Sequence, residues 1–344
     1  MFIPRLYLKC CGAKLYKNEH CICNIHNIRI QPTLRSDMTP IELDDILVFT
    51  TISAREKNDE TNKKRERIIC GIINKQIPEH YYQQSEDWGK IRQCVWDYVR
   101  SLASDTTIET VECKLRAGRG CHYDFTVIIN EALTYNIELK YNNVPQFVSP
   151  MNPSQYMNLS YEEFYYDNYL PKLLILGEFE MPDKETYLQK IHSPNPECVE
   201  HIQRKYYVGC KKDKHYSGIP EDIAFYEKAI SLSKTSISMF IENAELNLLK
   251  LSDYLLETQR GKIIMFFKNG AFTKEIVNEK EYTLVSYIKD PAKSRFVATT
   301  ETGKYLNILL RWKNGNGIAY PAFQIKELKN LPKTPKPRKS AKHN

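Results

Sequence analysis

The most constraining feature of this 344-residue chain is a change of hydrophobic period between residues 85 and 141. From Ser85 to about Ala103 the apolar residues recur every three or four positions, which predicts an amphipathic helix capped by Ser85. The following residues are rich in β-branched side chains and alternate in polarity, which predicts strands; these segments are 107–115, 123–129 and 133–141. One helix followed by three strands is therefore expected, with a turn at 130–132 between the last two.

A second helix and a fourth strand are expected after these elements. Ser160 and Glu163 have capping-box spacing, and the helix that they open is predicted to end before Pro171. Residues 173–176 are all apolar and predict a short buried strand. A helix between the third strand and an apolar fourth one is typical of a parallel crossover. The predicted order is therefore αβββαβ.

Three charged residues are predicted to meet on this scaffold. Glu138 and Lys140 are two residues apart on the third strand, so their side chains share one face. Asp124 begins the second strand, and a hairpin around residues 130–132 would bring it beside Glu138. Carboxylate oxygens hold Mg²⁺, which can activate water and stabilise charge on a phosphate, while a lysine can orient the water. The pattern therefore predicts metal-assisted phosphodiester hydrolysis.

With these residues the segment resembles the PD-(D/E)XK nuclease superfamily. The motif is Asp124, thirteen residues, then Glu138-Leu139-Lys140, with Tyr123 where the family commonly has proline. The resemblance implies an α/β fold with a restriction-endonuclease-like αβββαβ core, in which helices flank a mixed central sheet. A mixed α+β C-terminal region would follow this core.

The stretches 311–325 and 145–171 are similar to those of stand-alone type II restriction endonucleases. This resemblance implies Mg²⁺-dependent double-strand cleavage of DNA at a short specific sequence, with a homodimer and a cognate DNA methyltransferase as partners. It further implies a third metal-binding carboxylate, for which Glu86 and Glu112 are candidates, and a supporting polar group at Gln146.

Several alternatives stay open on the sequence alone. Asp124, Glu138 and Lys140 also fit a surface salt-bridge ladder across a hairpin. The same three residues would serve a structure-specific repair or recombination nuclease. A nucleic-acid-binding protein with a non-catalytic, nuclease-like core is the alternative outside the enzymes. Glu-x-Lys spacing also recurs at Glu112 and Glu327, so the motif has weight only in its structural context.

Candidate DNA contacts cluster in three places. Lys114, Arg116 and Arg119 precede Asp124, and a second basic patch spans residues 204–214. The third place is the Gly-rich segment 310–317, in which Arg311, Lys313 and Asn314 could reach base edges. The first two groups also fit solvated faces, and Asn-Gly in the third also favours a plain hairpin turn.

The N-terminal segment 1–29 is rich in cysteine and histidine. Its candidate zinc ligands are Cys11 (or its neighbour Cys10), Cys21, Cys23 and His26. Four such ligands can hold a structural Zn²⁺, but the paired C-x₂-C spacing of strong zinc motifs is missing. Structural zinc and reduced, unliganded cysteines are both open.

The net charge of +7 is concentrated at one end of the chain. Residues 329–344 hold six Lys or Arg and no acidic residue, so the remainder is close to neutral. A tail of this composition is expected to be disordered. No apolar run approaches the roughly 18 residues of a membrane helix, and no secretory pattern is visible. We expect no membrane partner and an intracellular, non-secreted protein, cytoplasmic or in the host cell if virus-encoded.

These observations divide the chain into five predicted segments. The Cys/His-rich segment 1–29 is followed by an extension at 30–84 and the nuclease core at 85–181. Residues 182–328 are predicted to serve DNA recognition or dimerisation, and the basic tail is 329–344.

Overall fold

The computed structural model describes residues 40–51, 58–116, 122–141 and 148–328. The elements below belong to the unit that begins at Ile41. The helices are α1 Asn58–Ile73, α2 Glu79–Gln84, α3 Glu86–Ala103, α4 Tyr161–Asn168, α5 Leu170–Gly177, α6 Lys184–Lys190, α7 Glu200–Gly209, α8 Pro220–Asn243 and α9 Leu248–Gln259. The strands are β1 Val111–Leu115, β2 Phe125–Ile129, β3 Leu133–Tyr141, β4 Val148–Met151, β5 Lys262–Lys268, β6 Ala271–Ile276, β7 Leu284–Asp290, β8 Arg295–Thr300, β9 Tyr305–Trp312 and β10 Pro321–Leu328.

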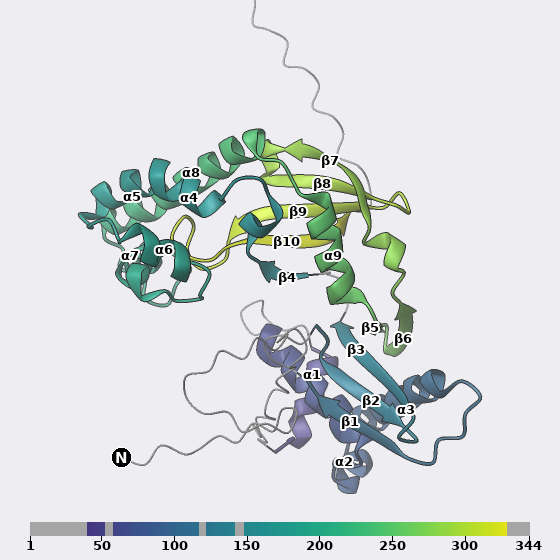
Figure 1. Ribbon diagram of the computed structural model, residues 1–344. Helices are drawn as coiled ribbons and strands as arrows, with labels where there is room; N and C mark the ends of the chain where they lie inside the picture. Colours follow the sequence, from purple (N-terminus) through teal and green to yellow (C-terminus); the bar gives the residue numbers. More distant parts are fainter. Residues whose placement is uncertain (1–39, 52–57, 117–121, 142–147, 329–344) are drawn as a thin grey trace, which may run out of the picture. The chain divides into compact units, whose positions relative to one another are not determined.

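Within the described ranges, the first sheet has five strands in the order β1-β2-β3-β5-β6 (Figure 1). β1, β2 and β3 pair antiparallel, β3 and β5 pair parallel, and β6 returns antiparallel. Asn130 and Glu131 adopt the left-handed conformation between β2 and β3, with φ of 52° and 57°. The predicted hairpin with its turn at 130–132 is thereby confirmed.

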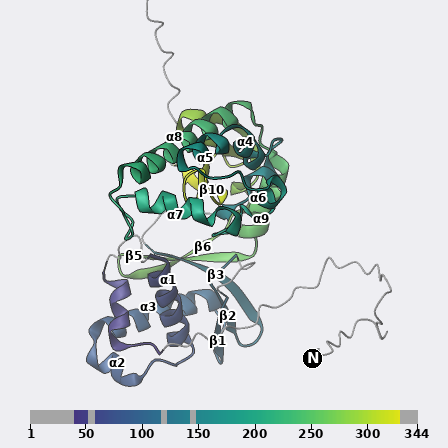
Figure 2. The same cartoon turned by 90° about the vertical axis from the view of Figure 1, so that its left-hand side faces the viewer.

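Helices α1 and α3 pack against one face of this sheet (Figure 2). The face of α3 that the periodicity predicts to be buried is buried, from Trp88 to Leu102. The sheet contributes to the same core the residues Cys113, Phe125, Val127, Ile129, Ile137, Met265 and Phe267. Because successive strand side chains alternate, Asp124 and Glu138 belong to the opposite face.

The prediction of a strand at residues 173–176 is wrong, since these residues lie in α5. Pro171 stands in the first turn of α5, where its missing N–H costs nothing. Leu170, Leu173 and Leu174 are buried, whereas Ile175 is 79% exposed. This one-sided burial is helical, and a run of four apolar residues does not distinguish a buried helix from a buried strand.

The parallel neighbour of β3 is β5 instead, with Glu138 beside Ile264. Helix α9 immediately precedes β5, so with β4 and helices α4 to α8 left out the order along the chain is α3-β1-β2-β3-α9-β5. Residues 142–247 intervene between β3 and α9. The mixed sheet flanked by helices is confirmed, but it draws two of its strands from beyond the predicted core range 85–181.

Among the described residues, the remaining strands form an antiparallel sheet in the order β4-β10-β9-β8-β7. Its core joins strand residues such as Leu310 and Phe323 to Tyr161 of α4, Phe240 of α8 and Leu255 of α9. The region 182–328 is therefore mixed in secondary structure, as predicted. Within the described ranges, none of the helices has both the length and the apolar character to cross a membrane.

Glu162, in the first turn of α4, is a buried acid that connects three segments. Its carboxylate accepts hydrogen bonds from the hydroxyls of Ser154 and Ser160 and contacts Nε2 of His192. Burial by itself raises the pKa of Glu162, but the hydrogen bond and charge of His192, with the Ser154 hydroxyl, bring the pKa below its ordinary value. The ionised form of Glu162 is therefore the one that stabilises this junction.

Glu162→Gln is expected to lower the free energy of unfolding by about 2 kcal/mol near neutral pH. A carboxyl whose pKa is lower in the folded state stabilises above the unfolded pKa of about 4.3 and loses that contribution as pH falls through the folded pKa. Urea unfolding at several pH values should show that the difference in unfolding free energy between Glu162→Gln and the wild type shrinks as the pH falls below about 4.3. Glu163→Gln is the matched control, because Glu163 is exposed and forms a surface ion pair with Lys184. A difference that stays constant into strong acid would contradict this role for Glu162.

Candidate active site

Asp124 and Glu138 lie side by side on adjacent strands. The β2–β3 register pairs Phe125 with Ile137, which puts Asp124 opposite Glu138 one position further along. The backbone N–H of Asp124 donates to the carbonyl of Ile137 at 2.8 Å. Oδ2 of Asp124 accepts the N–H of Leu139 at 2.7 Å. The carboxylate of Asp124 is thus fixed against the backbone of the segment that carries Glu138 and Lys140.

Glu138 is held between two lysines. Its Oε1 contacts Nζ of Lys140, and its Oε2 contacts Nζ of Lys262, the first residue of β5. The Lys262 side chain is only 3% exposed, and Nζ also donates to the carbonyl of His122 at 3.1 Å. Lys140 is more accessible, at 22%. Two carboxylates and two ammonium groups therefore meet at the junction of β2, β3 and β5.

The pKa shifts show how burial acts on this group. Burial is the largest effect on Asp124 and raises its pKa, and the negative charge of Glu138 raises it further. The N–H of Leu139 and the two lysines act in the opposite direction without cancelling the rise. Burial likewise lowers the pKa of Lys262, although the neighbouring Glu138 partly offsets this. Additional positive charge beside Asp124 would therefore be stabilised.

The donor set fits a hard divalent cation. Asp124 uses Oδ2 for the Leu139 N–H, which leaves Oδ1 for another ligand. Glu138 supplies Oε1, now in contact with the more accessible Lys140, whereas its Oε2 contacts the buried Lys262. Carboxylate oxygens with several retained waters are the usual protein environment of Mg²⁺. Asp124 and Glu138 are thus the residues that would hold Mg²⁺.

The structure does not bring either candidate third carboxylate to this pair. Glu86 is 83% exposed and pairs with Lys90 on α3. Glu112 shares the sheet face of Asp124, but it lies beside Ile128, four residues along β2, and pairs with Lys114. Across the ranges the structure describes, no group of three or more His, Cys, Asp or Glu is arranged to hold a metal.

Of the nearby basic candidates, Arg116 lies beside the acidic pair. Its N–H donates to the carbonyl of Asp124 at 2.8 Å, and its Nε donates to the Thr126 hydroxyl at 3.3 Å. Lys114, on β1, is directly opposite Thr126. These two cations and the carboxylate of Asp124 are thus carried on adjacent strands. Arg119 and Gln146 lie outside the described residues.

The candidates in the Gly-rich segment lie at the end of β9 and in the turn that follows it. Arg311 is on β9 and donates through Nη1 to Oε1 of Gln324. Exposed Lys313 lies over the ring of Tyr320, while the amide of Asn314 donates to the carbonyl of Pro194 at 2.6 Å. The turn is thus anchored internally at Asn314, and Lys313 remains the accessible cation.

Some of the other sequence candidates are paired, some are exposed, as Lys211, Lys212 and Lys214 are, and some lie outside the described residues. In the basic patch 204–214, Arg204 pairs with Glu200 and Lys205 with Asp222. The zinc candidates lie outside the described residues, as does the basic tail. These candidates are Cys11, Cys21, Cys23 and His26.

Lys262 is a residue of the candidate site that the sequence did not predict. The signal was visible, since Gly261 and Asn269-Gly270 bracket a Lys-Ile-Ile-Met-Phe-Phe-Lys segment of strand character. The sequence did not show that this strand, β5, is the parallel neighbour of β3, because more than one hundred residues separate the two strands. Lys262 enters the site only through that pairing.

Comparison of this chain with protein-family models, with curated proteins and with solved structures finds no match.

Proposed function

We propose that this chain is a Mg²⁺-dependent endodeoxyribonuclease of the PD-(D/E)XK type, which cuts both strands of DNA at a short specific sequence as type II restriction endonucleases do. The observation that carries the proposal is the placement of Asp124, Glu138 and Lys140 on one face of β2 and β3. The order α3-β1-β2-β3-α9-β5 supports the same likeness.

Each residue has a distinct role in the proposed reaction. Asp124 and Glu138 would hold Mg²⁺, which would supply activation of water and stabilisation of charge on the phosphate. Lys140, the more exposed lysine, orients the attacking water and neutralises the developing negative charge. Buried Lys262 holds the Glu138 carboxylate in place from β5. Water attacks phosphorus, the bond to the leaving oxygen breaks, and that oxygen takes up a proton.

The proposed substrate is double-stranded DNA. Lys114 and Arg116, which flank the acidic pair, are placed to neutralise backbone phosphates. A two-fold homodimer would match a palindromic target, and a DNA methyltransferase would be the genetic partner protecting it. Reading of base edges is assigned to Arg311, on β9 of the second sheet, and to Lys313, in the turn that follows β9.

The test is incubation of the full-length protein with plasmid DNA and Mg²⁺, followed by sequencing of the fragment ends. Ends that share one short sequence support a type II restriction endonuclease. Ends without shared sequence, together with preference for branched or damaged substrates, would favour a structure-specific nuclease. DNA binding without any Mg²⁺-dependent cutting would favour the non-catalytic alternative and contradict the proposal.

Deleting residues 329–344 is expected to weaken DNA binding at low salt without changing the sequence that is cut. The segment carries six cations and no acidic residue, so its contribution should be non-specific. Binding measured across salt concentrations should show a shallower salt dependence for the truncated chain. A changed cleavage sequence would show instead that the tail takes part in recognition.

A further inference from the structure

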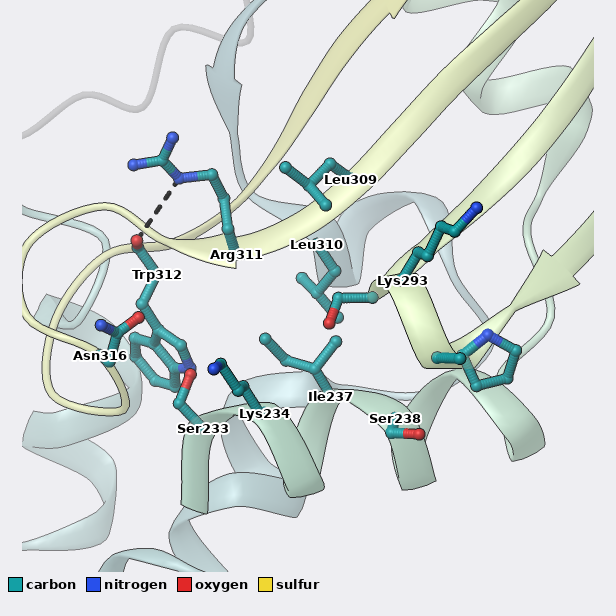
Figure 3. Close-up of a pocket in the computed structure, with 13 residues that line it drawn as sticks. Ser233, Lys234, Ile237, Ser238, Lys293, Leu309, Leu310, Arg311, Trp312 and Asn316 are labelled. Atoms are coloured by element: carbon teal, nitrogen blue, oxygen red, sulfur yellow. Dashed lines mark hydrogen bonds between the residues drawn. The ribbon is translucent and has the colours of Figure 1, made fainter. Parts of the chain in front are cut away.

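A separate cavity of about 460 Å³ lies between α8, the 3₁₀ turn Pro291–Lys293 and the end of β9 (Figure 3). Its volume is typical of pockets that bind small molecules. None of its lining residues belongs to the acidic pair or to the first sheet. The cavity is thus distinct from the candidate active site.

The charge of this pocket is entirely positive. Lys234, Lys293 and Arg311 line it, and no acidic residue does so among those the structure describes. Arg311 is engaged with Gln324, whereas neither lysine forms an ion pair with a carboxylate in the described ranges. Like charges on one cavity repel one another, and an anion relieves that repulsion. The lining therefore favours an anionic ligand.

The other lining groups narrow the ligand class. The hydroxyls of Ser233, Ser238 and Ser294 offer hydrogen bonds to oxygen atoms, and the indole of Trp312 forms part of the wall. That indole is fixed, because its N–H donates to the hydroxyl of Tyr161 at 2.9 Å. In Figure 3 Lys234 extends toward the Trp312 end, while Lys293 stands on the other side of the cavity. Trp312 itself is only 4% exposed and its ring packs against Tyr161 and Tyr165, so the cations and hydroxyls are the groups that suit a ligand, and they suit a phosphate.

We propose that this pocket binds the phosphate of a nucleotide, through Lys234 and Lys293. The phosphate belongs either to a free nucleotide or to a DNA strand, and only the second source rests on the proposed nuclease function. The chemistry of recognition is the same for both, since each lysine, on its own side of the cavity, offers an ammonium group for charge-assisted hydrogen bonds to phosphate oxygens.

The test compares the full-length wild type with the double variant Lys234→Gln/Lys293→Gln, using deoxyadenosine monophosphate and a short DNA duplex as probes in EDTA. Lys228→Gln is the matched control, because Lys228 is an exposed lysine of the same helix outside the pocket. Loss of one charge-assisted contact corresponds to about a tenfold loss of affinity, so the double variant should lose at least that much. Thermal unfolding should be unchanged, since both lysines are exposed.

The two probes distinguish the sources of phosphate. Loss of monophosphate binding in the double variant identifies a free-nucleotide pocket. Loss of duplex affinity alone, with a smaller salt slope and no monophosphate binding by wild type, identifies a DNA-backbone contact. The proposal is overturned if wild type binds neither probe, or if the double variant binds both as well as Lys228→Gln does. Repeating the titrations in Asp124→Asn separates this result from any failure of the nuclease assignment, because pocket binding should survive there.

Discussion

Asp124→Asn is expected to reduce the rate of DNA cleavage about a thousandfold, because it removes a metal-binding charge that contributes several kcal/mol to the reaction. The substitution keeps the shape of the side chain. Its amide oxygen can still accept the N–H of Leu139, which Oδ2 accepts at 2.7 Å in the wild type. Stability should therefore change little. Single-turnover cleavage in Mg²⁺, together with thermal unfolding, measures the two effects separately.

Glu86→Gln and Glu112→Gln are the matched controls for Asp124→Asn. Both carboxylates are exposed and pair with a neighbouring lysine rather than with the acidic pair. We expect cleavage by both variants at the wild-type rate. A loss comparable to that of Asp124→Asn in either variant would show that a third carboxylate joins the site when DNA binds. Wild-type cleavage by Asp124→Asn would contradict the assignment of the site itself.

Glu138→Gln is expected to lower the free energy of unfolding by about 3 kcal/mol, because it removes the carboxylate that the buried ammonium of Lys262 contacts. The Lys262 side chain is 3% exposed, and its remaining partner is the carbonyl of His122. Glu138→Ala is therefore a poor probe of catalysis alone, since its loss of activity would include a loss of folded protein. Asp124→Asn is the better probe of catalysis, because its stability should change little.

A double-mutant cycle isolates this interaction. In a Lys262→Met background no ammonium is stranded, so Glu138→Gln should cost about 1 kcal/mol or less. Urea unfolding of the wild type, both single variants and the double variant gives the coupling directly. Lys268→Met is the control, because Lys268 is an exposed lysine at the opposite end of β5. If Glu138→Gln lowered the free energy of unfolding equally in the wild type and in Lys262→Met, Lys262 and Glu138 would not be coupled.

The part of the site that the sequence predicted is the part set by local structure. Strand alternation places Glu138 and Lys140 on one face, and the short turn at 130–132 fixes which residue faces which across the hairpin. Asp124 could therefore be placed opposite Glu138 from its distance to the turn. The helical period of residues 86–103 similarly identified the buried face of α3.

The part that could not be predicted depends on pairing between distant segments. Residues 173–176 fit a buried strand and a buried helix equally well by period, and only their packing decided the outcome. The actual parallel neighbour of β3 is β5. Between β3 and β5 the chain forms β4 and the helices α4 to α9. No local pattern encodes which strand pairs with β3 across such a distance. Lys262 was missed for that reason alone.

The most direct test of the central claim is cleavage of supercoiled plasmid DNA by the wild type in Mg²⁺, beside the same reaction in EDTA and beside Asp124→Asn in Mg²⁺. A site built on Asp124 and Glu138 predicts linear or nicked product only in the first reaction. Product of equal amount in EDTA, or with Asp124→Asn, would contradict it.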